Sequence, residues 1–457
     1  MSNQKPRLPK GMRDFGPDKM AKRRFIFHAI RTTFEKFGFE ALETPTMENL
    51  SVLTGKYGEE GDQLLFKVLN SGDYLSGTSV EDYTSGARSL SSKIAEKGLK
   101  YDLTVPFARY VVMNRHDLTL PFKRYQIQPV WRADRPQKGR YREFYQCDAD
   151  VIGTDSLICE AEIILMMNEV FAKLGIRDYN IKINNRKILT GIAGMIGEPD
   201  KISELCVAID KLDKIGPEKV LEELITKSFS DQAITALKPF LKVEGDNDRT
   251  LNNIKALLAS SGPGQEGIRE FEDILSYLAQ FEAGDNHLEF DPRLARGLAY
   301  YTGTILEVKV NNVDIGSVSA GGRYDDLTGV FGMPGISGVG FSFGVDRIYD
   351  VMETLGLFPE DTSITTTVLV TNFDKASEPY AIEVLGQLRN AEVKSEIYPE
   401  PARLKKQMNY AHKKNIPYVL LIGEEEVSSN MMTLKDMRNG EQKKMTTPEI
   451  IEALKNG

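Results

Sequence analysis

The feature that most restricts the fold of this chain is a pair of extended stretches, residues 123–132 and 142–152, on either side of a short basic loop. The loop contains Pro136 and Gly139, residue types that are typical of turns. Extended runs separated by such a loop are typical of a β-hairpin. We therefore predict two antiparallel strands joined by a basic turn.

One face of the second strand is strongly polar. Alternate side chains of a strand lie on the same face, and here they are Arg142, Phe144, Gln146, Asp148 and Asp150. A solvated sheet face is the alternative interpretation, but an aromatic residue among charges and a basic turn beside it argue against that. Because arginine donates two parallel hydrogen bonds to phosphate and an aromatic ring can stack on a base, the pattern favours a nucleoside triphosphate site. Arg132 is the first candidate.

A second arginine stands near the end of a glycine-rich strand. Residues 338–344 lead into a helix whose first turn presents Arg347, where backbone N–H groups add positive potential. The chain has no Gly-x-x-x-x-Gly-Lys-Ser/Thr loop, and its Gly-x-Gly-x-x-Gly match at residues 262–267 lies within the helical stretch 185–281 instead of following a strand, as a dinucleotide fingerprint would. The common nucleotide-binding folds are therefore disfavoured.

Composition limits the other options. With 457 residues the chain is expected to form two or three domains. Its net charge of -8 does not by itself predict nucleic-acid binding, so any such contact must come from local basic patches, such as residues 132–142 and 403–414. The three cysteines are too irregularly spaced for a zinc site, and we expect Cys147 to be buried. Without a membrane-length apolar run, we expect a cytoplasmic protein.

Helical and extended patterns alternate along the rest of the chain. Residues 19–37 and 156–174 have helical periodicity, and the same periodicity dominates residues 185–281, which predicts a helical insertion. Residues 70–98 are rich in Gly and Ser, so we predict an inserted loop with a short helix near its end. After a boundary near residues 359–363, alternating strands and helices indicate a small α/β domain with a mostly parallel sheet.

Five ordered segments resemble one family. Residues 131–146 (Trp-Arg-Ala-Asp-Arg-Pro-Gln-Lys-Gly-Arg-Tyr-Arg-Glu-Phe-Tyr-Gln) closely resemble motif 2 of the class II aminoacyl-tRNA synthetases in its histidyl form. The segment ending at Pro45 resembles motif 1, and residues 338–347 resemble motif 3. Residues 294–301 (Leu-Ala-Arg-Gly-Leu-Ala-Tyr-Tyr) and 320–325 (Ala-Gly-Gly-Arg-Tyr-Asp) are similar to stretches specific to the histidine enzymes. The chain therefore resembles the histidyl-tRNA synthetases.

The resemblance covers nearly the whole chain, except the loop of residues 70–98, and it implies an α+β fold. That fold has a six- or seven-stranded antiparallel sheet flanked by helices, a helical insertion and a C-terminal α/β anticodon-binding domain. The implied domains are a class II catalytic domain of residues 1–184 and 282–358, an insertion of residues 185–281, and an anticodon-binding domain of residues 364–457.

The resemblance also implies a nucleotide site. Arg132 would hold the α-phosphate of ATP, Phe144 would stack on adenine, and Arg347 would hold the γ-phosphate. Asp134 would lie near the adenine amino group, and Arg142 would be a further ATP contact. Mg²⁺ would accompany the phosphates, with no metal site of the protein's own and no tightly bound organic cofactor.

For L-histidine, the family pattern assigns the α-amino group to Asp102 and Thr104, assisted by Gln146. Asp150 and Tyr301 would each bond one nitrogen of the imidazole. A buried polar pair of this kind rejects ligands that cannot satisfy it. The implied reaction is activation of histidine by ATP to histidyl-adenylate and pyrophosphate, followed by transfer of histidine to the 3′ end of its tRNA.

Arg296 would be the distinctive catalytic cation, in contact with histidine and flanking the α-phosphate together with Arg132. Tyr300 is a weaker candidate for the histidine pocket, because its strand parity is opposite to that of Tyr301. The implied contacts with the acceptor end of histidine tRNA, which carries an extra 5′ guanosine, lie in the motif 2 loop: Arg135, Gln137, Lys138 and Arg140. Motif 1 implies a homodimer, and neither membrane nor DNA is an expected partner.

Two departures from the family pattern are visible. The family usually has an acid where this chain has Ala299, and many bacterial members have Glu in place of Asp150. Three alternatives are a regulatory paralogue that binds histidine without charging tRNA, a class II synthetase for threonine or proline, and a non-catalytic RNA-binding protein. The C-terminal domain with Arg132, Arg296 and Arg347 argues against the first, residues 296–298 against the second, and the triphosphate site against the third.

Overall fold

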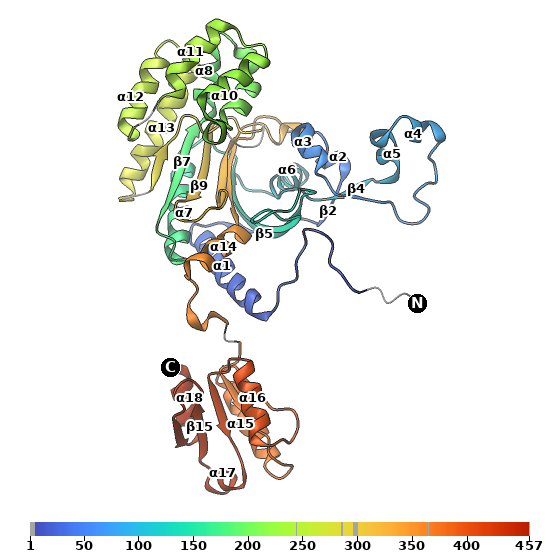
Figure 1. Ribbon diagram of the computed structural model, residues 1–457, viewed down its shortest axis with the longest axis vertical. Coiled ribbons are helices and arrows are strands. Elements are labelled where there is room, and N and C mark those ends of the chain that lie inside the picture. The colour runs from blue at the N-terminus through green and yellow to red at the C-terminus, as the bar shows by residue number, and fades with distance from the viewer. Residues whose placement is uncertain (1–4, 244, 285–286, 296–299, 364, 457) are drawn as a thin grey trace. The chain divides into compact units, whose positions relative to one another are not determined.

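The computed structural model describes residues 5–243, 245–284, 287–295, 300–363 and 365–456 (Figure 1). The chain forms two compact units. The first contains Ile26–Phe358 with the chain up to Asp14, and the second contains Phe15–Phe25 with Pro359–Gly457. Over the described ranges, no helix is long and apolar enough to cross a membrane.

The first unit is built on an eight-stranded sheet with the order β1-β5-β6-β11-β10-β9-β7-β8. Its strands are β1 (Glu40–Ala41), β5 (Phe122–Trp131), β6 (Glu143–Ile152), β7 (Tyr179–Asn185), β8 (Leu288–Phe290), β9 (Thr304–Val310), β10 (Ser319–Tyr324) and β11 (Gly338–Gly344). The inner strands are antiparallel, whereas β1 and β8 join the two edges in parallel. The sheet has eight strands instead of the six or seven that the resemblance implied, and the short parallel strand β8 extends it at one edge.

The predicted hairpin is confirmed as β5 and β6, which lie inside the sheet. The polar face of β6 continues across β11, where Gly340 is the register partner of Asp150. A Cβ atom at Gly340 would lie 2.1 Å from Oδ1 of Asp150, so only glycine leaves room for this carboxylate. The glycine pattern of the strand is thus a packing requirement of the polar face.

Two predicted helices cover the opposite face of the sheet. They are α1 (Pro17–Lys36) and α7 (Ile158–Lys173). The ring of Phe34 lies 5.7 Å from that of Tyr125 and 6.2 Å from that of Phe343, and Phe171 of α7 packs edge-on against Phe343. Cys147, whose parity is opposite to the polar residues of β6, is fully buried as expected. One face of the sheet is therefore apolar and covered, which leaves the polar face for ligands.

The predicted helical insertion is confirmed as helical and is drawn in green and yellow in Figure 1. It contains α8 (Arg186–Met195), η1 (Pro199–Lys201), α9 (Ile202–Ile209), α10 (Leu212–Thr226), α11 (Asp231–Leu241), α12 (Asn247–Leu257) and α13 (Gly262–Gln280). Gly216, with a φ of +79°, interrupts α10 directly before Pro217. The helix α8 begins at the residue after β7, so no loop separates the large sheet from the insertion at this point.

The loop of residues 70–98 contains two helices rather than the one predicted. They are α4 (Val80–Thr84) and α5 (Ala87–Ile94), and Ser79 caps α4 through a reciprocal pair of hydrogen bonds with Asp82. Helices of 5 and 8 residues are too short to give a clear period. The neighbouring elements of this part are β2 (Met47–Asn49), α2 (Leu50–Leu53), α3 (Gly58–Gln63), β3 (Lys67–Val68), β4 (Lys97–Leu99) and α6 (Thr104–Met113). The strands form a separate sheet with the order β2-β4-β3.

The first unit ends with η2 (Gly329–Phe331) and α14 (Val345–Leu355), and η3 (Glu360–Ser363) precedes the sheet of the second. The remaining elements of the second unit are β12 (Val368–Val370), α15 (Glu378–Asn390), β13 (Ser395–Ile397), α16 (Leu404–Lys413), β14 (Tyr418–Leu421), α17 (Glu424–Ser429), β15 (Met432–Asp436), β16 (Gln442–Met445) and α18 (Thr447–Asn456). The sheet order is β13-β12-β14-β15-β16, and only the pairings of β12 are parallel. The prediction of a mostly parallel sheet missed the final antiparallel hairpin, whose second strand is exposed and lacks an apolar pattern.

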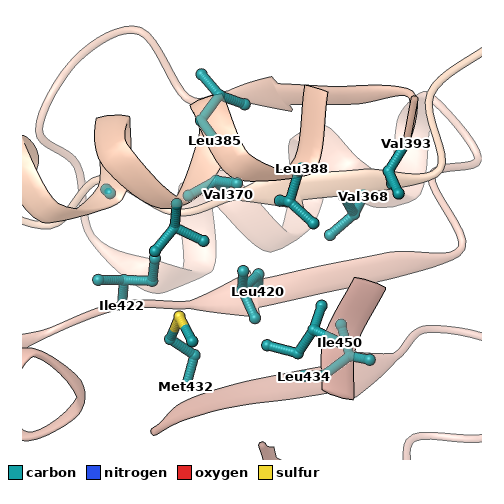
Figure 2. Packing of buried hydrophobic residues seen from close by; sticks show 12 residues of the cluster. Val368, Val370, Leu385, Leu388, Val393, Leu420, Ile422, Met432, Leu434 and Ile450 are labelled. Carbon is teal, nitrogen blue, oxygen red and sulfur yellow. The ribbon is translucent and has the colours of Figure 1, made fainter. Parts of the chain in front are cut away.

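The core of the second unit lies between its sheet and its helices (Figure 2). Val368, Val370 and Leu420 come from the central strands, and Leu388 of α15 and Ile450 of α18 pack against them; each is less than 1% exposed. Fully burying a side chain of this size stabilises a fold by roughly 1.5–3 kcal/mol. This unit therefore has an apolar core of its own.

Candidate active site

The polar face of the large sheet forms a cavity of about 600 Å³ in the first unit, a size typical of ligand sites. Its floor comes from β6, β10 and β11, and its walls come from the start of α6, the motif 2 loop and residues 300–301. Eleven of the residues singled out from the sequence line it: Asp102, Thr104, Arg132, Asp134, Arg140, Phe144, Gln146, Asp150, Tyr300, Tyr301 and Arg347. The structure thus brings most of the predicted ATP and histidine residues together.

Arg132 lies between two aromatic rings at one wall. Its Nε donates to the carbonyl oxygen of Tyr101 at 3.0 Å, and its guanidinium carbon lies 4.2 Å from the centroid of the Tyr101 ring and 5.2 Å from that of Phe144. Among the described residues, neither terminal nitrogen of Arg132 has a hydrogen-bond partner. Its fork is therefore held in place while its two outer donors face the cavity.

The motif 2 loop is a tight turn. The backbones of Gln137 and Arg140 bond each other in both directions, and Gly139 between them has a φ of +70°, which favours glycine. Asp134 is buried and forms an ion pair of 2.9 Å with Arg140. Arg135, Gln137 and Lys138 are exposed and do not line the cavity. The loop therefore holds one acid inward and presents basic side chains to solvent.

Arg347 reaches this loop from the first turn of α14. Its Nε donates to the carbonyl oxygen of Gly139 at 3.0 Å and its Nη1 donates to that of Ser317 at 2.7 Å. Arg142, in contrast, does not line the cavity, because its Nε donates to the carbonyl oxygen of Asp134. Its side chain also packs where any Cβ at Gly11 would stand, 2.8 Å away. Arg142 therefore braces the loop against the N-terminal segment.

Asp102 is buried at the start of α6. Its Oδ1 accepts from the backbone N–H of Val105 at 3.1 Å and from the hydroxyl of Tyr57 at 2.9 Å. Its Oδ2 is buried and has no hydrogen-bond partner among the described residues. Burial raises the pKa of Asp102, and the Val105 N–H opposes that rise. One carboxylate oxygen is thus fixed by the protein and the other is left for a ligand.

Asp150 is held by two buried groups. Tyr324 donates to its Oδ1 at 2.8 Å, and Nη2 of Arg124 lies 2.8 Å from its Oδ2. Arg124 is fully buried, and its guanidinium carbon lies 4.2 Å from the centroid of the Phe107 ring. A buried ion pair is strongly destabilised when one partner is removed. The orientation of Asp150 is therefore set before any ligand arrives.

Tyr300 and Tyr301 both line the cavity, although opposite strand parity predicted that Tyr300 would pack behind it. The parity argument fails here because β9 begins at Thr304, so neither tyrosine lies on a strand. Their rings meet edge-on with centroids 5.0 Å apart. Burial raises the pKa of both hydroxyls, so each keeps its proton and can donate a hydrogen bond.

Asp148 is a cavity residue to which the sequence assigned no role. It is 2% exposed, and its Oδ1 has no hydrogen-bond partner among the described residues. Burial raises the pKa of Asp148 to about 7, an effect that Arg124 opposes and Asp150 reinforces. Three carboxylic acids, Asp102, Asp148 and Asp150, thus share one cavity, and the buried guanidinium of Arg124 forms an ion pair with Asp150.

The raised pKa of Asp148 makes a prediction for the free protein. Because this pKa lies above its value in an unfolded chain, the folded state binds more protons between about pH 4 and about 7, and stability falls as pH rises through that interval. An Asp148→Asn variant has no carboxyl group to titrate at this position, so it does not show this loss of stability. We expect its thermal unfolding midpoint, relative to that of the native protein, to rise by a few degrees between pH 5 and 8. A constant difference across that range would contradict the assignment.

Arg296, the predicted catalytic cation, and Ala299 beside it lie outside the described residues. The sequence missed Tyr57, Arg124, Asp148 and Tyr324 as contributors to the site. Asp148 had a signal, since it shares strand parity with Gln146 and Asp150, and Tyr324 lies in the segment 320–325 that resembles the histidine enzymes. Tyr57 and Arg124 enter through contacts between distant segments.

Similarity to known proteins agrees with this arrangement. Residues 93–348 match the family described as histidyl-tRNA synthetase, and residues 367–457 match the family described as anticodon binding domain. A histidine–tRNA ligase of Cytophaga hutchinsonii is 56% identical over 451 residues, which cover 99% of this chain and 100% of that protein. A histidine–tRNA ligase of Phocaeicola vulgatus is 55% identical, with 99% of each chain covered.

The chain belongs to the histidyl-tRNA synthetase family. The family is one of ATP-dependent ligases that join histidine to tRNA, so the predicted enzyme class is confirmed. A crystal structure of histidyl-tRNA synthetase from Nostoc sp. PCC 7120 superimposes with a TM-score of 0.84 at 30% identity, covering 99% of this chain and 100% of that one. The α+β fold predicted from the resemblance to the histidyl-tRNA synthetases is confirmed as well.

The same fold also occurs in the predicted regulatory alternative. A structure described as an ATP phosphoribosyltransferase regulatory subunit/histidyl-tRNA synthetase from Bacillus halodurans superimposes with a TM-score of 0.71 at 19% identity. Fold alone therefore does not separate catalysis from regulation in this family. The cavity residues must carry that distinction.

Proposed function

We propose that this chain activates L-histidine with ATP and then esterifies it to the 3′ end of histidine tRNA. The observation that carries the proposal is the single cavity that holds a triphosphate-binding side, with Arg132, Phe144 and Arg347, beside an acidic amino-acid side, with Asp102 and Asp150. A regulatory protein that only bound histidine would need the second side and not the first. The two sides together suit a reaction between a carboxylate and a nucleotide.

The nucleotide side binds ATP at three places. Phe144 stacks on the adenine, with Asp134 near the adenine amino group. Arg132 takes the α-phosphate with the two outer nitrogens of its fork, which have no hydrogen-bond partner within the described part of the chain. Arg347, held by Gly139 and Ser317, takes the γ-phosphate from the N-terminal turn of α14. With these three contacts, ATP lies along the wall of the cavity from Phe144 to Arg347.

Mg²⁺ accompanies the ATP phosphates. Mg²⁺ in such sites is usually bound by one or two carboxylates together with substrate phosphates and water. Glu307, a buried carboxylate that accepts from the hydroxyl of Ser317, lies beside the Arg347 side of the cavity and would contribute an oxygen ligand. When bound, the ion neutralises charge on the phosphates.

Histidine binds at the acidic side with its α-ammonium group on Oδ2 of Asp102, the oxygen for which the described residues supply no partner. The hydroxyl of Thr104 and the Oε1 of Gln146, whose amide nitrogen already donates to Ser342 at 3.1 Å, complete this contact. Asp150 accepts from one imidazole nitrogen and Tyr301 donates to the other, with Tyr300 packed beside it. Side chains without both a donor and an acceptor leave a buried group unsatisfied and are rejected.

The activation step needs no side-chain nucleophile. A carboxylate oxygen of histidine attacks the α-phosphorus, the bond to the bridging oxygen breaks, and pyrophosphate leaves with that oxygen's electron pair. Arg132 meets the charge that grows on the α-phosphate, and we assign Arg296 the same task from the resemblance. In the second step a terminal ribose hydroxyl of the tRNA attacks the carbonyl carbon and AMP leaves.

The tRNA partner meets two regions. The exposed motif 2 residues Arg135, Gln137, Lys138 and Arg140 contact the acceptor end, and phosphate contacts of this kind make binding salt-sensitive. The second unit, with the basic stretch of residues 403–414, contacts the anticodon part. We further propose a cytoplasmic homodimer formed through motif 1, with no membrane or DNA partner.

Tyr57 provides a test of the α-ammonium contact. Its hydroxyl orients Asp102 without lining the cavity, so Tyr57→Phe leaves Oδ1 with the Val105 N–H alone and lets the carboxylate turn. We expect the KM for histidine to rise about 10-fold, corresponding to one lost hydrogen bond to a charged group, with kcat changed less than about 3-fold. The exposed Tyr83, in the 70–98 loop, supplies the matched control variant Tyr83→Phe. An unchanged KM in Tyr57→Phe would contradict the orienting role.

The proposed function is tested by charging. Purified chain, ATP, Mg²⁺ and labelled histidine are incubated with histidine tRNA, with the same tRNA lacking its extra 5′ guanosine, and with a tRNA for another amino acid. We expect charging of the first, slower charging of the second and none of the third. Histidine binding without charging of any tRNA would instead support the regulatory alternative.

A further inference from the structure

The stretch of residues 292–303 carries Arg296 and both cavity tyrosines, and the structure describes it on either side of residues 296–299. Its leading half, up to Ala295, belongs to no helix or strand, so the backbone hydrogen bonds of regular secondary structure do not hold it. Catalysis by a fixed cation requires the backbone that presents the cation to be fixed as well. The groups that hold the two ends of this stretch therefore bear on the activation step.

Asn184, near the end of β7, holds the leading half. It is 1% exposed, and its amide nitrogen donates to the carbonyl oxygens of Pro292 and Leu294, both at 2.9 Å. The side-chain amide nitrogen of Asn184 has two hydrogens, and both of them bond to this segment. A buried side chain that bonds two carbonyls of one irregular segment fixes its path.

Arg186, two residues later, holds the last described residue before Arg296 and also the far end. Its Nη1 donates to the carbonyl oxygen of Ala295 at 3.2 Å, and its backbone N–H donates to that of Gly303 at 2.8 Å. The same Nη1 lies 3.3 Å from Sγ of Cys206 on α9, which ties the guanidinium to the helical insertion. Residues 184–186 thus bracket the stretch from both ends.

We propose that Asn184 and Arg186 are positioning residues for the activation step, acting through the stretch that presents Arg296. This inference rests on the proposed function, because it takes the role of Arg296 from there. Neither residue lines the cavity, so neither binds substrate. Substituting their side chains loosens the leading half of the stretch, whereas the bond from the Arg186 backbone N–H to Gly303, close to the two tyrosines, is kept.

The expected result is a loss in kcat rather than in binding. Misplacement of a catalytic group by about 1 Å costs roughly 10²-fold in rate, so we expect Asn184→Ala and Arg186→Gln to lower kcat of histidine-dependent pyrophosphate exchange by about 10- to 100-fold. The KM values for histidine and ATP should change less than about 3-fold. Arg186→Lys keeps a donor for the Ala295 carbonyl and should recover most of the rate.

Asn180→Ala is the matched control. Asn180 lies on the same strand, and its amide nitrogen donates to Glu289 on β8 at 2.6 Å, away from residues 292–303. We expect its exchange rate to equal that of the native chain. Thermal unfolding of each variant shows whether it is folded, and Arg186, which is only partly buried, offers the gentler substitution should Asn184→Ala fail to fold.

A double-mutant cycle decides between positioning and general destabilisation. If Arg186 acts through Arg296, Arg186→Gln costs little further rate in an Arg296→Ala background. Losses that multiply in the double variant would overturn the proposal, as would a KM effect without a kcat effect. If Arg296→Ala alone left exchange unchanged, the proposed role of Arg296 would fail; if it lowered exchange while Arg186→Gln did not, the positioning proposal alone would fail.

Discussion

Replacing Arg132 by alanine is expected to lower kcat of histidine-dependent pyrophosphate exchange by about 10²- to 10³-fold, the usual cost of removing one fixed donor from a developing anion. The side chain is anchored through Nε to the Tyr101 carbonyl and lies over two aromatic rings, so its two outer nitrogens point at a fixed place. Arg132→Lys keeps a positive charge but loses the fork, and we expect it to recover only a small part of the rate.

Steady-state exchange at saturating histidine and ATP measures this effect. The matched control is Arg177→Ala, which removes an exposed arginine shortly after α7 and should leave exchange unchanged. If Arg132→Lys were as active as the native chain, a point charge would suffice and the proposed bidentate contact with the α-phosphate would be wrong.

Replacing Asp150 by alanine is expected to raise the KM for histidine by about 10²- to 10³-fold, because the imidazole loses its acceptor in a buried site. The same change removes the partner of Arg124, a fully buried cation, and breaking a buried ion pair costs roughly 3–5 kcal/mol of stability. The two effects must be separated for the result to bear on specificity.

A second substitution separates them. Arg124→Leu in the Asp150→Ala background removes the unpaired buried charge, so the double variant should regain thermal stability while its KM for histidine stays high. Recovery of histidine binding together with stability would mean that Asp150 serves the fold and does not read the imidazole. Asp150→Glu keeps a carboxylate acceptor for the imidazole and should retain activity.

The sequence predicted the site best where one local pattern carried the information. The alternating residues of β6 gave the polar face, and Gln146 and Asp150 line the cavity as that pattern indicated. Arg142 shares their parity but turns to the Asp134 carbonyl, because it stands at the hairpin end, where the strand geometry stops. A period of two residues says which side chains share a face and not how far the strand extends.

Contacts between distant segments could not be predicted from the chain alone. Tyr57 and Asp102 are 45 positions apart, and Tyr324 and Asp150 are 174 apart. No local sequence pattern therefore predicts either hydrogen bond. The same limit applies to Asn184, which looks like an ordinary residue at the end of a strand until the carbonyls of Pro292 and Leu294 are placed beside it. Packing of the whole first unit creates these partners.

Short elements were the other source of error. The strand β8 and the helices α4 and α5 are too brief for a hydrophobic period, and the exposed strand β16 has no apolar face to reveal it. None of these elements lines the cavity. The errors in the predicted fold therefore left the predicted site largely intact.

The most direct test of the account is pyrophosphate exchange measured with each standard amino acid in turn, using the complete chain with ATP and Mg²⁺. We expect exchange with histidine alone, since its imidazole presents a donor to Asp150 and an acceptor to Tyr301 from two nitrogens of one planar ring. Exchange with threonine or proline in place of histidine, or histidine binding without any exchange, would contradict it.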